Sequence, residues 1–125
     1  MWSWFKNGNT DTDDGDSVAE GIGQGRVTQN VAAALVDDAY RIDDQVAVEV
    51  LYHLLRDEGL YLGLSSAINV AGAVKLARER GPGQVITTVL CDGGARYASK
   101  LYNSAWLAEQ NLTPTARHLE FLDRL

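Results

Sequence analysis

Two adjacent serines at the start of a helix-like stretch are the residues of this sequence best placed to do chemistry. Ser65 and Ser66 follow a glycine in the run GLSSAINVAGAVKLARERGPG, which spans residues 63–83. Capping explains one of them, because a single hydroxyl can accept a hydrogen bond from a first-turn N–H. The other hydroxyl would stand at the positive end of a helix, where it could bind a ligand or act as a nucleophile.

A serine-hydrolase reading is the weaker functional alternative. Gly63, Ser65 and Ala67 approximate the pattern G-x-S-x-G, and Asp92 and His118 follow in the chain order Ser, Asp, His. A nucleophile elbow, however, needs a buried strand that runs into the serine. Only the three residues LYL separate the two preceding glycines, so the sequence disfavours this reading.

Two other binding patterns fail at a required position. GIGQGR, residues 21–26, has Arg26 where the dinucleotide fingerprint needs its third glycine. The acidic stretch that begins at Asn9 has Asp14 where a calcium loop needs glycine. We therefore predict a solvated acidic loop and no metal site.

Composition bounds the remaining functions. The 125 residues suit one domain or part of one, and 17 acidic against 11 basic residues give a formal charge of −6, which disfavours nucleic acid and anionic membranes as partners. Cys91 is the single cysteine and lies in an apolar run, so we expect a buried thiol and no disulfide. The first residues turn polar after Phe5 and no apolar stretch is long enough to span a bilayer, so we expect a cytoplasmic protein.

Two helices are expected around the serine pair. Asp43 is a candidate N-cap, and Val46, Val50 and Leu54 recur every four residues, which predicts a helix of about four turns that ends near Gly59. A second helix should begin with Ser65 or Ser66 as its cap. Alanine and glycine keep this helix narrow, and the glycine and proline at 81–82 should end it.

The rest of the chain predicts strands as well as helices. Ala39–Ile42 is a plausible short strand, and Val85–Leu90 is a continuous apolar, β-branched run typical of a strand buried on both faces of a parallel sheet. A helix should follow over Tyr97–Glu109, and a last amphipathic turn should begin at Thr113 and Pro114. One or two parallel strands do not make a covered sheet, so we expect a piece of an α/β domain.

Four consecutive stretches carry a family resemblance. They are EGIGQGRVTQN, VDDAYRI, EGLYLGLSSAINVAGAVKLA and TVLCDGGARYASKLYNSAWL, in this order along the chain. From Trp2 to about Leu112 the sequence resembles the C-terminal part of the cysteine synthases, pyridoxal-phosphate enzymes of the tryptophan-synthase-β fold type. A close relative such as cystathionine β-synthase is the alternative within the fold type. The resemblance implies an α/β C-terminal fragment of a parallel-sheet fold, with helices flanking one or two remaining strands.

We divide the chain into three regions on this basis. Residues 1–16 hold an aromatic start and the acidic loop, residues 17–112 are the partial pyridoxal-phosphate enzyme, and residues 113–125 are a helical extension. The aromatic start contains Trp2, Trp4 and Phe5, which we expect to be exposed.

The resemblance also implies roles for particular residues. Ser65 matches the serine that takes the pyridine nitrogen of the cofactor, and a neutral hydroxyl there suits β-replacement because it leaves the ring largely unprotonated. Glu20, Gly21, Ile22 and Gly23 resemble the loop on the substrate side of the cofactor, and the strand end at 92–94 should lie nearby. The family usually has glycine where this sequence has Ala67, a change that the first helical turn should tolerate.

Other family motifs do not occur in this sequence. The cofactor lysine motif S-x-K-D-R, the substrate loop T-S-G-N-T and the phosphate loop G-T-G-G-T are all missing, and Lys6, Lys75 and Lys100 match none of them. We therefore expect no catalytic residue in this chain, weak or no binding of pyridoxal phosphate, and no cysteine synthesis by the chain alone. The whole enzyme would convert O-acetylserine and sulfide to cysteine and acetate, usually as a homodimer. The alternative is a non-catalytic module that docks on a full-length synthase or is complemented by a separate N-terminal half, with the aromatic start as its interface.

Overall fold

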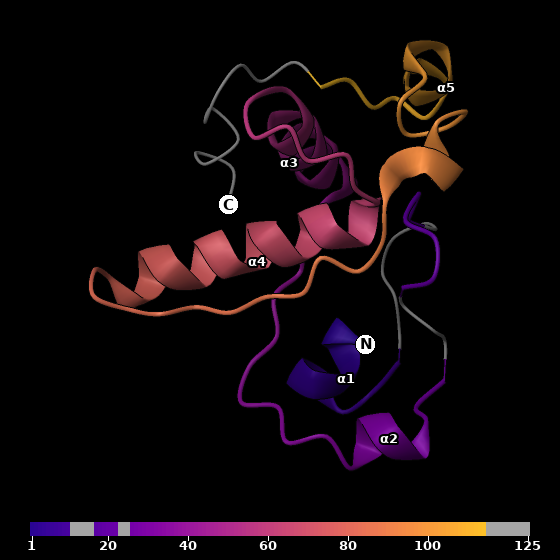
Figure 1. Cartoon of the computed structure of the whole chain (residues 1–125). Helices are drawn as coiled ribbons and strands as arrows, with labels where there is room; N and C mark the ends of the chain where they lie inside the picture. Colours follow the sequence, from indigo (N-terminus) through magenta and orange to yellow (C-terminus); the bar gives the residue numbers. More distant parts are fainter. Residues whose placement is uncertain (11–16, 23–25, 115–125) are drawn as a thin grey trace. The chain divides into compact units, whose positions relative to one another are not determined.

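The computed structural model describes residues 1–10, 17–22 and 26–114 (Figure 1). The chain divides into two compact units, Met1–Arg41 and Ile42–Leu125. No helix within the described part of either unit is long and apolar enough to cross a membrane.

The first unit contains two short helices. Helix α1 (Trp2–Asn7) ends at Gly8, whose φ of 75° lies in the left-handed region that glycine adopts without strain. Helix α2 (Gln29–Ala32) is capped by Thr28, whose hydroxyl accepts a hydrogen bond from the third residue of the helix at 3.4 Å. The three aromatic residues of α1 are half-buried, so the expectation that they are exposed is wrong.

The expected strand at Ala39–Ile42 does not form in this structure. A strand needs a neighbouring strand for its N–H and C=O groups, and the described residues of the unit include no strand. The carboxylate of Asp38 instead accepts a hydrogen bond from the N–H of Ala39 at 2.7 Å. It also forms an ion pair with Lys6.

The second unit is built on two helices that pack together, α3 (Asp44–Arg56) and α4 (Leu64–Arg80) (Figure 1). The predicted apolar stripe of α3 forms the centre of the core, because a helix with this periodicity buries one face. The buried apolar side chains of the two helices are Val46, Ala47, Val48, Val50, Leu51, Leu54, Leu64, Ala67 and Ala71. The sequence-based prediction of these helices is confirmed.

Glycines end both helices. Gly59 has a φ of 70°, and the N–H of Leu60 donates to the carbonyl of Leu54 across the end of α3 at 2.8 Å. Gly81 has a φ of 77° at the C-cap of α4. The start of α4 differs from the prediction, because its N-cap is Gly63 and both serines lie inside the first turn.

After α4 the chain turns back and runs extended along the helix (Figure 1). The sequence predicted Val85–Leu90 as a strand buried on both faces, but Val85, Val89 and Leu90 are 96%, 66% and 46% exposed. The prediction of a buried strand is wrong for this chain, because burial of such a strand requires neighbouring strands that the described residues do not provide. Cys91, at the end of the segment, is exposed rather than buried.

The expected helix over Tyr97–Glu109 is two shorter elements. A 3₁₀ turn, η1 (Gly94–Tyr97), comes first, and helix α5 (Ser104–Glu109) follows. The side chain of Asn103 accepts hydrogen bonds from the N–H groups of the next residues and so starts a new helix. The last predicted helical turn lies almost wholly outside the described residues.

Candidate functional site

The residues before α4 and those after the extended segment are held together at the helix N-terminus. Leu62 and Gly93 form an isolated antiparallel bridge. The N–H of Gly63 donates to the carbonyl of Asp92 at 2.9 Å, and the N–H of Gly94 donates to the carbonyl of Tyr61 at 3.0 Å. Two chain segments thus fix the position of the first turn of α4.

This junction is packed so closely that one of its glycines has no room for a side chain. A Cβ on Gly63 would lie 2.1 Å from Oδ1 of Asp92 and 2.7 Å from the ring of Tyr97. The Tyr97 hydroxyl donates to Oδ2 of Asp92 at 2.6 Å, while Oδ1 is buried without a hydrogen-bond partner among the described residues. Asp92 and Tyr97 therefore set the shape of the turn that leads into the serines.

The two serines have different surroundings. Ser66 is fully buried, and its Oγ accepts a hydrogen bond from the N–H of Cys91 at 2.9 Å. Ser65 is half-buried, and within the described part of the chain its hydroxyl makes no hydrogen bond. The first serine of the pair is thus the one whose hydroxyl can serve a ligand.

The position of Ser65 suits a neutral aromatic nitrogen. The glycine N-cap offers no side chain to the first-turn N–H groups, and the first turn itself contains no acidic residue. A hydroxyl can donate a hydrogen bond to an unprotonated ring nitrogen, whereas a carboxylate would favour the protonated form. The residues present therefore fit the pyridine side of pyridoxal phosphate.

Three tyrosines support the same turn: Tyr52 on α3, Tyr61 just before α4, and Tyr102 just before α5. The Tyr102 hydroxyl donates to the carbonyl of Leu62 at 2.5 Å, and its ring lies 4.6 Å from the ring of Tyr61 and 5.9 Å from that of Tyr52, measured between centroids. Burial raises the pKa of Tyr102 to about 12, so this hydroxyl remains a donor at neutral pH.

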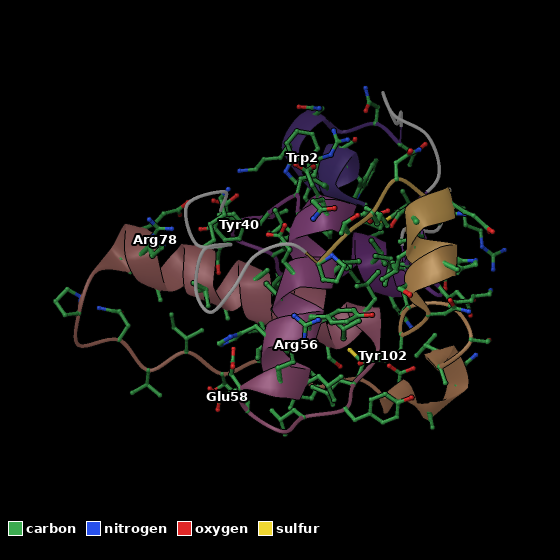
Figure 2. The ribbon with its side chains drawn as sticks, turned by 90° about the horizontal axis from the view of Figure 1, so that it is seen from above. Trp2, Tyr40, Arg56, Glu58, Arg78 and Tyr102 are labelled. Carbon is green, nitrogen blue, oxygen red and sulfur yellow. The ribbon has the colours of Figure 1, made fainter. Side chains whose placement is uncertain are left out.

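Tyr52, the member of this cluster on α3, makes a cation–π contact and a hydrogen bond. Figure 2 shows Arg56 on α3, and its guanidinium lies 4.9 Å from the ring centroid of Tyr52. The Tyr52 hydroxyl donates to the carbonyl of Leu101 at 3.2 Å, next to the labelled Tyr102. Sequence reasoning missed the supporting tyrosines and the Asp92–Tyr97 contact. Tyr61, Asp92, Tyr97 and Tyr102 do lie in the third and fourth family-like stretches, whereas Tyr52 lies in none of the four.

The substrate-side residues lie in the first unit. Gly21 has a φ of 77°, which glycine adopts readily, and Glu20 and Ile22 are exposed. Gly23 falls outside the described residues. Because Ser65 belongs to the second unit, a common site for these residues and Ser65 stays a prediction.

The local structure around Ser65 also bears on the hydrolase reading. Leu62, just ahead of the turn, is a lone bridge residue rather than part of a strand, and the carboxylate of Asp92 accepts a hydrogen bond from Tyr97. His118 lies outside the described residues. The turn into Ser65 therefore lacks the strand that a nucleophile elbow needs.

Comparison with known proteins identifies the family to which this chain belongs. Residues 3–92 match the family described as pyridoxal-phosphate dependent enzyme. This match covers well over half of the chain, and the chain belongs to this family. The family has the tryptophan-synthase-β-like fold, so the predicted fold type is confirmed at that level.

The similar curated proteins are cysteine synthases. The chain is 43% identical over 115 residues to cysteine synthase 1 of Neurospora crassa, covering 90% of this chain and 31% of the relative. It is 46% identical over 101 residues to cysteine synthase 2 of Schizosaccharomyces pombe, covering 79% and 26%. It is 47% identical over 95 residues to the cysteine synthase of Dictyostelium discoideum, covering 76% and 25%.

The chain therefore spans only a quarter to a third of the length of these relatives. The resemblance to the C-terminal part of a cysteine synthase is confirmed.

Proposed function

We propose that this chain supplies the pyridine-nitrogen side of a cysteine synthase site, with Ser65 as the hydrogen-bond partner of the ring nitrogen. The observation that supports the proposal is the difference in hydrogen bonding between the two serines. The Ser66 hydroxyl accepts a hydrogen bond from the N–H of Cys91, while the Ser65 hydroxyl makes no hydrogen bond among the described residues. A hydroxyl fixed at a helix N-terminus donates to the nitrogen without bringing a negative charge.

The reaction follows from the relatives. The whole enzyme is proposed to be a transferase that exchanges the acetate of O-acetylserine for sulfide and gives cysteine. Bound pyridoxal phosphate would supply the electron sink for this β-replacement. Ser65 would keep that sink modest, and Glu20, Gly21, Ile22 and Gly23 would form the loop on the substrate side.

By itself the chain is proposed to be inactive. Lys6, Lys75 and Lys100 match no cofactor-lysine motif, and the sequence contains no phosphate loop of the family type. Without these groups the cofactor lacks both a covalent attachment and its main anionic anchor. Residues 17–112 would be the enzyme-like region, between the aromatic start and the helical extension.

A second candidate is a binding module that complements a synthase chain lacking this region. The exposed, unpaired segment Val85–Leu90 favours this candidate, because an open apolar strand edge is a template for pairing. The two candidates differ in whether the other part of the site belongs to the same polypeptide in the cell. A homodimer is the assembly proposed for the whole enzyme.

A chimeric enzyme tests the role of Ser65. We would fuse the full chain behind the N-terminal part of the Neurospora crassa relative, up to the start of the matched region, and record the visible spectrum with pyridoxal phosphate. Ser65→Asp should shift the cofactor absorption, because a carboxylate favours protonation of the ring nitrogen. Ser99→Asp is the matched control, since Ser99 is exposed and gains the same charge.

An identical shift for both variants, or none for Ser65→Asp in a chimera that binds the cofactor, would contradict the role of Ser65. The unfused chain, mixed with pyridoxal phosphate and passed through a gel-filtration column, should retain no lysine-linked cofactor. A stoichiometric adduct that borohydride fixes to one lysine would refute the proposed inactivity.

A further inference from the structure

A carboxylate from outside α4 lies against the residue that begins this helix. The N-cap glycine brings no side chain and the first turn of α4 holds no acidic residue, yet the side chain of Asp92 packs against that glycine. We propose that Asp92 is a positioning residue for Ser65, and that its negative charge sets the electrostatic potential at the Ser65 hydroxyl. The inference rests on the proposed role of Ser65 and names the residue that tunes it.

The main chain of Asp92 is tied to the first turn of α4. Figure 1 shows the extended segment returning to the start of the helix, where the antiparallel bridge joins the two stretches of chain. The Asp92 carbonyl accepts a hydrogen bond from the N–H of Gly63 at 2.9 Å. The Gly63 carbonyl in turn accepts one from the N–H of Ser66 at 3.1 Å. Two successive hydrogen bonds therefore connect the backbone of Asp92 to the turn that presents Ser65.

The side chain of Asp92 is held as closely as its main chain. Its Oδ2 accepts a hydrogen bond from the hydroxyl of the buried Tyr97 at 2.6 Å. Its Oδ1 is buried, has no hydrogen-bond partner among the described residues, and would lie 2.1 Å from a Cβ on Gly63. The oxygen that no donor occupies therefore faces the N-cap of α4, two residues before Ser65.

A negative charge at this place opposes the field of the helix at Ser65. The N-terminus of α4 carries a partial positive charge, which weakens a ring nitrogen as a hydrogen-bond acceptor. A carboxylate beside the N-cap offsets that charge, and salt screens a buried carboxylate oxygen less than an exposed one. The ring nitrogen would thus remain a good acceptor for Ser65 without having a carboxylate as its direct partner.

The other ionisable groups described at this junction are phenols, a thiol and a guanidinium. They are Tyr61, Tyr97, Tyr102, Cys91 and Arg96. The guanidinium of Arg96 lies 5.3 Å from the ring centroid of Tyr97 and belongs to an exposed residue, so water and salt screen its charge more than that of Asp92. We therefore expect the charge of Asp92 to dominate at Ser65.

An introduced thiol can report the potential at position 65 in the full chain without cofactor or partner. The chain would carry Ser65→Cys, because the pKa of a thiol follows the local potential, together with Cys91→Ser to remove the natural thiol. The pKa of the introduced thiol is obtained from the pH dependence of its alkylation rate, since accessibility changes that rate equally at every pH.

Adding Asp92→Asn to this chain should lower the pKa of the introduced thiol by about 0.5 or more. Asparagine keeps the shape of the side chain and an acceptor for the Tyr97 hydroxyl, and it removes the charge. Glu109→Gln is the matched control, because Glu109 is exposed at the end of α5 and loses the same charge. This control should leave the thiol pKa within about 0.2. A purely structural role of Asp92 would change stability and leave the thiol pKa where it was.

Asp92→Ser is a second neutral variant, for which the same fall in pKa is expected if Asp92→Asn loses the circular dichroism of the unsubstituted chain. An unchanged or raised thiol pKa in a folded neutral variant, an equal fall with Glu109→Gln, or failure of both neutral variants to fold would overturn the inference. The readout needs neither pyridoxal phosphate nor the chimera. A thiol that responds to Asp92, beside a chimera whose spectrum ignores Ser65→Asp, would therefore refute the role of Ser65 alone, and the reverse result would refute the role of Asp92 alone.

Discussion

Replacing each serine of the pair separately should separate structural support from ligand binding. Ser66→Ala removes the buried oxygen that accepts from the N–H of Cys91 at 2.9 Å. Ser65→Ala removes a half-buried hydroxyl that has no hydrogen bond among the described residues. We expect the first change to lower the free energy of unfolding and the second to leave it nearly unchanged.

The size of the change in the free energy of unfolding depends on which groups lose a hydrogen bond in each variant. Loss of one hydrogen bond, with an N–H that keeps only partial access to water, costs about 1–2 kcal/mol. A surface-type change such as Ser65→Ala stays within about 0.5 kcal/mol, and alanine is the better helix former of the two residues. For a small domain, a loss of 1 kcal/mol lowers Tm by roughly 4–8 °C.

Urea unfolding of the full chain, followed by circular dichroism, measures both effects. Ser66→Ala should lower the midpoint at an unchanged slope, which indicates lost stability rather than an altered denatured state. Amide exchange should also rise at Cys91, because its N–H loses the Ser66 oxygen as its acceptor. Equal midpoints for the two variants, or a larger loss for Ser65→Ala, would refute the assignment of the supporting role to Ser66.

Three further predictions use other contacts of the same unit, each checked by urea unfolding. Gly63→Ala should destabilise by about 1–3 kcal/mol, because the new Cβ would lie 2.1 Å from Asp92 Oδ1; an unchanged midpoint would contradict the close packing. Gly72→Ala should stabilise by about 0.5–1 kcal/mol, because Gly72 lies within α4 and nothing lies within 4 Å of its added Cβ; a loss of stability would contradict this. The pKa of Tyr102 is raised from 10.0 to about 12, so its stabilising effect is complete below pH 10 and lost as the pH rises through 12. Tyr102→Phe should therefore flatten the fall of stability over that range, and an equally steep fall in this variant would show that other groups cause it.

The helices of the second unit could be predicted because their signals are local. A four-residue apolar period specifies the buried face of α3, and glycines with positive φ at positions 59 and 81 mark the ends of α3 and α4. Each of these signals acts within one or two turns of chain. The N-cap of α4 was misplaced because serine is the commoner cap, whereas here the contact with Asp92 requires a glycine at position 63.

The strands could not be predicted correctly because their formation depends on distant sequence. Val85–Leu90 has the composition of a buried strand, but composition does not provide the neighbouring strands. The different roles of the serines have the same origin. The N–H that occupies the Ser66 hydroxyl lies 25 residues further along the chain, so nothing near the pair shows which serine is engaged.

The serine pair and the extended segment at residues 84–90 are connected by one hydrogen bond. The hydrogen bond from Cys91 to Ser66 anchors the end of the segment at 84–90 to the first turn of α4, where Ser65 lies. A strand that docks on this segment would therefore be held in a fixed relation to the Ser65 hydroxyl. If that strand belongs to the polypeptide that carries the cofactor lysine and the phosphate loop, pairing would bring the two parts of the site into register. The buried serine would then matter for catalysis without touching the cofactor, because it couples the docking surface to the residue that does.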